Sequence, residues 1–315
     1  MARIGTSDLD VFPLNLGGNV FGWTADRDES FRILDAFVEG GGNFIDTADS
    51  YSAWVEGNTG GDSERIIGAW LADRKPANVT VATKVSQHPD FTGLSASNVR
   101  AAAEASLERL GVEQIDLYYA HFDDESVPLE ETVAAFGNLV ADGLVRYTAV
   151  SNYSADRIRE WIRIARDLGV AEPVAVQPHY NLVERGIEET VLPVAEEFGL
   201  SVFPYFSLAK GFLAGKYRSA DDAGSPRAGA AKEYINEENL ALLDAVERIG
   251  QAHDASIATT SLAWLRSRPA VLAPIASASR VDQVADLLAA GRLELTEDEL
   301  AELDRLSSPT VSQSA

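Results

Sequence analysis

The sequence predicts a single (β/α)8 barrel, that is, a TIM barrel, and three observations support this fold class. Eight short apolar or β-branched runs of strand length occur along the chain, each followed by a helical pattern or a long loop. The chain has 315 residues, which is enough for one barrel of this kind. No linker or internal repeat interrupts the alternation, so we expect residues 1–315 to form one domain. An open doubly wound sheet is the alternative, and eight alternating units favour the closed barrel over it.

The predicted elements follow one another in a regular order. The strands are Val11–Leu16, Phe44–Asp46, Val79–Lys84, Leu117–His121, Tyr147–Ser151, Val174–Gln177, Ser201–Tyr205 and Val271–Ala276. Helical spacing covers Phe31–Val38, Ile66–Leu71, Val99–Leu110, Val133–Val140 and Ile158–Leu168. Helix starts are predicted at Ser95, Ser154 and Thr296, and helix ends at Gly111, Gly143, Gly169 and Gly199. Arg3–Ile4 and Leu9–Val11 predict a short N-terminal β-hairpin that closes the bottom of the barrel, and the tail after Leu306 is expected to be disordered.

The composition narrows the classes of function. The chain carries 26 basic and 49 acidic residues, a formal net charge of −23, which disfavours nucleic acid and anionic membranes as partners. It contains no cysteine, so disulfides, thiolate nucleophiles and cysteine-bound metals are excluded. No signal peptide is visible, and no apolar run approaches the roughly 20 residues of a membrane helix. We therefore expect a cytoplasmic protein, whose oligomeric state the sequence leaves open.

Polar residues close the predicted strands. In a β/α barrel the carboxyl ends of all strands meet at one rim, where the chemistry takes place. The residues at these ends are Asp46, Lys84, His121, Ser151, Asn152, Gln177, Tyr205, Phe206, Ser207, Ser277, Ser279 and Arg280. Long loops follow several strands at the same face. The sequence therefore predicts a polar site at the C-terminal mouth of the barrel.

Four of these residues suit acid–base chemistry on a carbonyl group. Asp46 beside Lys84 compensates a charge that burial would penalise. Tyr51 lies five residues after Asp46, and a nearby ammonium is expected to lower its pKa from roughly 10, which suits a general acid. His121 is placed to orient a carbonyl oxygen. Each residue alone also has a structural interpretation, as a cap, a loop aromatic or a core histidine. Their joint position at successive strand ends favours catalysis.

The same segments resemble the aldo-keto reductase family. GGNFIDTADSYSAW and GGDSERIIGAWL are similar to its signature, with the Asp and Tyr of the D-T-A-x-x-Y pattern. VATKV, LYYAHFDD, VSNYS, VQPHYNLVER, PYFSLAKGFLAGKYR and PIASASRVDQV resemble its later blocks in the same order. The resemblance runs from about Gly17 to Ala290. It implies a (β/α)8 barrel with a catalytic tetrad at Asp46, Tyr51, Lys84 and His121.

The resemblance also implies binding sites for NADPH or NADP. Ser151, Asn152 and Gln177 would hold the nicotinamide amide, and Tyr205 would stack on its ring. The rest of the implied cofactor site is Gly18, Asn19, Val20, Phe206, Ser207, Leu208, Gly211, Lys216, Arg227, Ser277, Ser279, Arg280 and Gln283. Two positions depart from the family pattern, because Ser277 replaces a glycine and Leu287 an asparagine, which weakens the case for adenine contact. The Ser279–Arg280 pair is intact, and the bidentate fork of arginine favours NADPH over NADH.

The implied function is reduction of a carbonyl compound by hydride transfer, with Tyr51 as the proton donor. Phe21, Trp23, Trp54 and Phe122 are the expected walls of the substrate pocket, which suit a neutral aldehyde, ketone or sugar. The segment Ala209–Tyr234 is expected to fold over the cofactor as a lid. The sequence leaves open the direction of the reaction, including oxidation of an alcohol. A nucleotide-sensing subunit like the potassium-channel β subunits of this family is the alternative. A metal-dependent barrel enzyme is disfavoured because the four histidines show no ligand spacing.

Overall fold

Eight parallel strands form the central sheet of the computed structural model, which describes residues 1–219 and 228–307. They are β3 (Asn15–Gly17), β4 (Phe44–Asp46), β5 (Thr80–Val85), β8 (Ile115–Ala120), β9 (Val145–Ser151), β10 (Ala175–Gln177), β11 (Ser201–Val202) and β12 (Ile275–Ala276). Their order in the sheet is β11-β10-β9-β8-β5-β4-β3-β12. The two outer strands also meet, because Leu272 N donates to Val202 O at 3.1 Å and Ile275 N to Pro204 O at 2.9 Å. The sheet therefore closes into a barrel, and the predicted fold class is confirmed.

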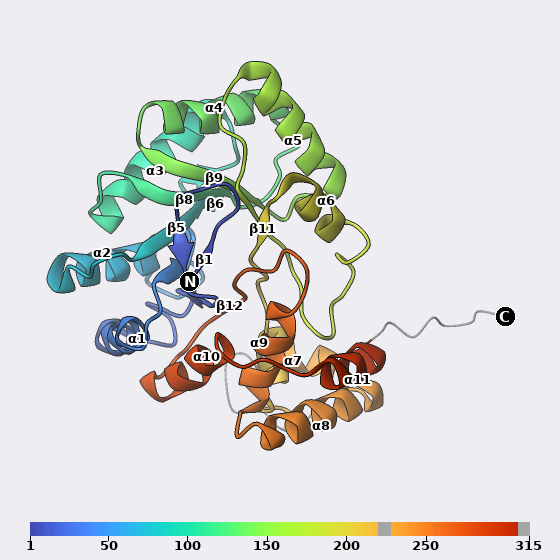
Figure 1. The fold of residues 1–315 in the computed structure, drawn as a ribbon. Coiled ribbons are helices and arrows are strands. Elements are labelled where there is room, and N and C mark those ends of the chain that lie inside the picture. The colour runs from blue at the N-terminus through green and yellow to red at the C-terminus, as the bar shows by residue number, and fades with distance from the viewer. Residues whose placement is uncertain (220–227, 308–315) are drawn as a thin grey trace.

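Helices surround the barrel (Figure 1). Those that follow the strands are α1 (Arg27–Glu39), α2 (Asp62–Arg74), α3 (Ala96–Leu110), α4 (Leu129–Ala141), α5 (Ala155–Leu168), α6 (Val191–Phe198), α9 (Ile257–Arg266) and α10 (Val284–Ala290). The loops add a hairpin, β6 (Gln87–His88) and β7 (Phe91–Thr92), with the helices α7 (Ala228–Ala231), α8 (Glu237–Ala252) and α11 (Glu297–Ser307). The short 3-10 helices are η1 (Ala209–Ala214), η2 (Lys232–Tyr234) and η3 (Val281–Gln283). No helix of the described residues is long and apolar enough to cross a membrane.

Local sequence explains where the helices begin and end. Ser154 caps α5, because its side chain accepts a hydrogen bond from Arg157 N, and Thr296 accepts one from Glu299 N. Ser95 is the N-cap residue of α3 but its side chain makes no such bond, and the Glu131 carboxylate accepts from the N–H of Ala96, the first residue of the helix. The helix-ending glycines at 111, 169 and 199 have the left-handed backbone of a C-cap, and the one at 143 follows the cap of α4.

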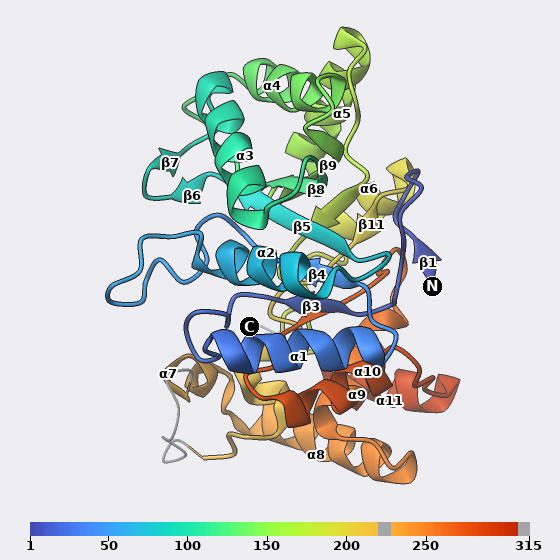
Figure 2. The same ribbon diagram turned by 90° about the vertical axis from the view of Figure 1, so that its left-hand side faces the viewer.

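The two ends of the barrel differ in chemistry. At the bottom, β1 (Ala2–Arg3) and β2 (Asp10–Val11) pair as the predicted antiparallel hairpin. Ile4, Leu9 and Val11 pack on the interior side chains of the strands. Figure 2 shows the hairpin β6–β7 and α7 at the opposite end from β1. The apolar hairpin therefore fills the bottom of the barrel and leaves the polar strand ends at the other mouth.

Several predicted strand limits need correction. The first barrel strand begins at Asn15, because Val11 is used in the hairpin. The seventh strand ends at Val202 rather than Tyr205, and proline at position 204 has no N–H to continue the ladder. The helix α11 extends to Ser307. The predicted disordered tail from residue 308 lies outside the described residues.

Candidate active site

A cavity of about 560 Å³ opens at the carboxyl ends of the strands. Of the predicted catalytic and cofactor residues, the following line it: Asn19, Asp46, Tyr51, His121, Asn152, Gln177, Tyr205, Phe206, Ser207, Leu208, Gly211, Lys216 and Ser277. Of the predicted pocket walls, Trp23, Trp54 and Phe122 line it. Residues from seven strand ends or the loops that follow them therefore meet in one space, as the strand-end positions predict.

Lys84 stands behind the cavity, at the centre of a buried hydrogen-bond network. Its side chain is fully buried, and Nζ donates to Asp46 Oδ2 at 2.6 Å, Thr47 O at 2.6 Å and Tyr51 OH at 2.9 Å. All three ammonium protons thus have acceptors. Asp46 is 1% exposed and receives a further bond at Oδ1 from Gln177 Nε2 at 2.9 Å. The pair fixes the Tyr51 hydroxyl at the cavity wall.

The pKa of Tyr51 is raised, not lowered, which corrects the expectation from sequence. Burial is the largest cause, and the negative charge of Asp46 is the second. Burial also lowers the pKa of Lys84, while Asp46 opposes that shift. The carboxylate lies 3.4 Å from the phenol oxygen and offsets the ammonium, so the sequence argument erred by weighing Lys84 alone. Tyr51 therefore keeps its proton at neutral pH in this structure.

His121 faces the same part of the cavity as a neutral imidazole. Burial, followed by the positive charge of Lys84, lowers its pKa well below the usual value. Its ring centroid lies 6.0 Å from that of Tyr51. Within the described residues Nδ1 has no hydrogen-bond partner. A neutral ring carries one N–H that can donate to a carbonyl oxygen beside the Tyr51 hydroxyl.

Amide and aromatic groups lie next to these residues. Asn152 Nδ2 donates to His121 O at 2.9 Å, and its Oδ1 accepts from Tyr205 OH at 2.6 Å. The Ser151 hydroxyl is buried and donates to Gln177 O at 2.8 Å. Tyr205 lines the cavity, and its ring stacks on that of His179, with the centroids 5.3 Å apart and the ring planes at 17°. Amide groups next to an aromatic wall fit a flat ring that carries a carboxamide.

The loop after β11 brings cationic side chains to the cavity. Lys210 and Lys216 line it, together with residues 206–208. Lys210 forms an ion pair with Glu233, so the two described ends of the predicted lid, Ala209–Tyr234, touch each other. Arg227 and the middle of that segment lie outside the described residues. Two lysines near a stretch of turn backbone suit a diphosphate group.

The residues predicted for the adenosine end lie at the start of the segment after β12. Ser279, Arg280 and Gln283 are not among the cavity-lining residues. The Arg280 guanidinium is exposed and pairs with Asp282 at 2.9 Å, while Gln283 Oε1 accepts from Ser279 N at 2.9 Å. The Ser277 hydroxyl donates to Asn19 Oδ1 at 2.6 Å. Leu287, the other departure from the family pattern, is buried in α10. The side chains predicted to meet a ribose phosphate are therefore already paired, Arg280 with Asp282 and Ser279 with Gln283.

Three predicted site residues lie elsewhere. Phe21, expected as a pocket wall, is fully buried in the core, and so is Val20. Gly18 is also buried, and its backbone oxygen accepts from the Ser63 hydroxyl at 2.8 Å. Phe21 and Val20 follow β3 in a tight turn whose side chains point into the protein. Of these, Phe21 is corrected to a core residue, and Gly18 and Val20 can offer only backbone atoms.

One cation of the site was given no role by the sequence analysis. Lys210 was part of a quoted motif but received no role, although it lines the cavity. His179, which the sequence suggests is structural, is not among the cavity-lining residues and stacks on Tyr205. His253, interpreted in the same way, pairs with Glu299 at 2.8 Å. Among residues 1–219 and 228–307, no group of three or more His, Asp or Glu side chains is placed to hold a metal ion.

Comparisons with known proteins agree with this geometry. The family model "Aldo/keto reductase family" matches residues 13–308. A probable voltage-gated potassium channel subunit beta from Oryza sativa is 32% identical over 298 residues, covering 90% of this chain and 88% of that protein. The uncharacterized oxidoreductase YrpG from Bacillus subtilis is 33% identical over 314 residues, covering 96% and 94%. A norsolorinic acid reductase from Aspergillus flavus is 29% identical over 317 residues, covering 95% and 78%.

Proposed function

The chain belongs to the aldo/keto reductase family of oxidoreductases, and we propose that it reduces an aldehyde or ketone to the alcohol with NADPH, with Tyr51 as the general acid. One observation carries the proposal. Tyr51 lines the cavity, and its hydroxyl accepts a 2.9 Å hydrogen bond from Lys84, which Asp46 holds in place. This arrangement keeps a protonated phenol at the cavity and an ammonium behind it.

The chain's own residues then account for the proton transfer. NADPH, when bound, supplies the hydride that reduces the carbonyl carbon. Tyr51 OH donates its proton to the carbonyl oxygen, and its raised pKa means that the proton is present at neutral pH. The phenolate left behind is stabilised by the Lys84 ammonium at 2.9 Å and recovers its proton from solvent. The reverse path, in which an alcohol is oxidised, uses the same groups.

The other tetrad member positions the substrate. A neutral His121 donates its N–H to the carbonyl oxygen and so directs this oxygen toward Tyr51. Trp23 and Trp54 meet edge to face at 5.6 Å, and Phe122 lies 5.0 Å from the His121 ring. These walls support a neutral substrate with an apolar flank.

The proposed cofactor site follows the same cavity. Asn152 and Gln177 would hold the nicotinamide amide, with Ser151 bracing the Gln177 backbone, and Tyr205 would stack on the ring. Lys210 and Lys216 would meet the diphosphate. Ser279 and Arg280 would bind a ribose phosphate, with Gln283 beside them, and this supports NADPH over NADH. The proposed partners are therefore small molecules, and the proposed location is the cytoplasm.

A nucleotide-binding subunit with little turnover is the second candidate. It is supported by the 32% identity to a probable potassium channel subunit beta. Both candidates predict NADPH binding, and only the first predicts rapid carbonyl-dependent oxidation of the cofactor. Stoichiometric binding of NADPH without turnover on a broad panel of aldehydes and ketones would favour the second.

The proposal is tested by replacing Tyr51 with phenylalanine. We expect Tyr51→Phe to lower kcat roughly 10²–10⁴-fold, because the general acid is lost, while the Kd for NADPH changes little. Absorbance of NADPH at saturating carbonyl substrate measures the rate. Tyr147→Phe is the matched control, since it removes a phenol that bonds Asp8 at the bottom of the barrel. Equal turnover of the Tyr51 variant and the wild type would exclude Tyr51 as the acid.

A further inference from the structure

The loop after β10, residues 178–190, contacts Tyr205, the residue that we propose stacks on the nicotinamide ring. His179 stacks on the Tyr205 ring, and Pro178 O accepts a hydrogen bond from Tyr205 N at 3.0 Å. Asn181 is fully buried, and its Nδ2 donates to Phe206 O at 2.9 Å. The position of Tyr205 at the cavity wall therefore depends on this loop as well as on β11.

The backbone beside Tyr205 needs such support. Phe206 has φ of 50°, in the left-handed region that a residue with a side chain rarely adopts. The bond from Asn181 to its carbonyl oxygen holds this conformation, and Asn181 Oδ1 in turn accepts from Val183 N at 2.9 Å. A loop that relaxed would release both the strained residue and the aromatic ring before it.

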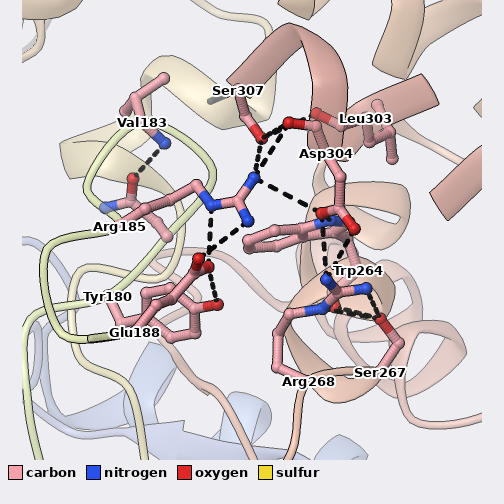
Figure 3. Close-up of polar contacts among 11 residues, drawn as sticks. Tyr180, Val183, Arg185, Glu188, Trp264, Ser267, Arg268, Leu303, Asp304 and Ser307 are labelled. Carbon is pink, nitrogen blue, oxygen red and sulfur yellow. Dashed lines mark hydrogen bonds and ion pairs between the residues drawn. The ribbon is translucent and has the colours of Figure 1, made fainter. Parts of the chain in front are cut away.

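One arginine of the same loop, Arg185, makes the loop's contacts with the C-terminal helix. Figure 3 shows Arg185 between the loop and α11. Its guanidinium donates to both carboxylate oxygens of Glu188 at 2.8 Å, and Glu188 also accepts from Tyr180 OH at 2.6 Å. The remaining nitrogen, Nη1, donates to Asp304 O at 3.1 Å and to Ser307 Oγ at 2.7 Å. Arg185 therefore joins the loop to the last described helix.

That helix is itself fixed to the barrel. The Asp304 carboxylate accepts from Trp264 Nε1 at 3.0 Å and pairs with Arg268 at 2.9 Å, both on or next to α9. Trp264 is fully buried and lies 5.7 Å from the Tyr180 ring. Figure 3 shows these groups as one continuous set of contacts. Arg185 is thus attached to a rigid base, and its own side chain is only 11% exposed.

We infer that Arg185 is a positioning residue of the cofactor site, which acts on NADPH binding through the β10–α6 loop and Tyr205. The inference rests on the proposed role of Tyr205 as the residue that stacks on nicotinamide. The planar fork of arginine serves Glu188 in a bidentate pair while a third nitrogen reaches α11. Lysine, with one compact ammonium, cannot make both contacts. The distant helix α11 therefore helps to hold Tyr205 at the proposed cofactor site.

The test replaces the planar guanidinium of Arg185 by a lysine ammonium, which keeps the positive charge. We expect Arg185→Lys to raise the Kd for NADPH roughly fivefold, the lower end of typical coupling between sites, and to change kcat at saturating NADPH by less than about twofold. Quenching of protein fluorescence by NADPH measures Kd. In a Tyr205→Ala background the same change is expected to alter Kd by less than about twofold. Arg163→Lys, in an exposed pair with Asp167 on α5, is the matched control.

A milder variant keeps the inference testable if Arg185→Lys fails to fold. Ser307→Ala removes one bond of Arg185, and we expect a shift of Kd of about twofold in the same direction. A lower Tm with an unchanged Kd would overturn the inference and leave Arg185 a structural residue only. A full fivefold effect that persists without the Tyr205 ring would also overturn it. Failure of the proposed function looks different, because wild-type protein would then show no NADPH binding or no turnover.

Discussion

The two ends of the proposed cofactor site are built in opposite ways. At the reaction end, Lys84 and Asp46 are 0% and 1% exposed, and both are fully hydrogen-bonded within the barrel rim. At the adenosine end, the side chains of Arg280 and Asp282 are each 64% exposed and form an ion pair at the surface. Chemistry requires groups whose geometry is set before the substrate arrives, because no reorganisation is then needed during the reaction. Reversible cofactor binding requires groups that can exchange one partner for another.

This difference predicts that substitutions at the two ends have effects of different size and kind. Water cannot solvate a buried charge that loses its partner, whereas it solvates an exposed charge.

Loss of the buried ammonium is expected to have the largest effect. Lys84→Met removes the donor to Tyr51 and leaves Asp46 without a counter-charge. We expect kcat to fall roughly 10³-fold and the free energy of unfolding to fall by about 3–5 kcal/mol. Steady-state kinetics and urea unfolding measure the two. Lys75→Met, at an exposed helix end, is the control. A kcat within tenfold of wild type would refute the idea that this end depends on its preset network.

Asp49, in the loop that follows Asp46, allows the buried end of the site to be tested through the pH dependence of stability. Asp49 is fully buried, and burial, followed by the charge of Glu64, raises its pKa well above the usual value. In the unfolded chain Asp49 ionises near pH 4, so folding retains a proton above that pH. Wild type therefore loses stability as pH rises from about 4 to the folded pKa, by up to about 1.4 kcal/mol per pH unit.

Asp49→Asn has no proton to retain at this position. We expect it to lack this component of the pH dependence, so that its stability relative to wild type increases from pH 4 to pH 8. Urea unfolding at several pH values measures the difference. Parallel curves for the two proteins would show that Asp49 is already ionised in the folded state.

At the adenosine end we expect smaller effects that depend on the cofactor. Arg280→Ala should raise the KM for NADPH roughly tenfold, since the bidentate phosphate contact is lost, and leave the KM for NADH unchanged. Asp282→Asn should lower the KM for NADPH about twofold, because it frees Arg280 from a competing partner. The two cofactors serve as each other's control. Equal changes with NADH would place the phosphate contact elsewhere.

Much of the architecture could be predicted from local sequence. The apolar runs at Phe44–Asp46 and Val79–Lys84 correspond closely to β4 and β5, because a strand buried on both faces is marked by its composition. Ser154 and Gly169 bound α5 as predicted, since caps are local interactions. The limits of the short strands were less accurate. Val11 shows why, because its partner in the hairpin, Ala2, is chosen by tertiary packing at the barrel bottom.

Within the candidate site, residue types were easier to predict than environments. Phe21 and Trp23 are two residues apart, yet the first lies in the core and the second on the cavity wall. Likewise, the sequence places Lys84 near Tyr51 but cannot show that Asp46 lies 3.4 Å from the same phenol. The direction of a pKa shift depends on such distances and on burial, which only the folded chain defines.

The sequence by itself determined the family, the alternation of strands and helices, and the polar residues that close the strands. These are properties of neighbouring residues and of residue order. The tertiary structure alone decided the raised pKa of Tyr51, the pairing of Arg280 with Asp282 and the link from Arg185 through the loop after β10 to Tyr205. Each of these depends on distances and burial in the folded chain, and the link from Arg185 to Asp304 joins segments 119 residues apart in sequence.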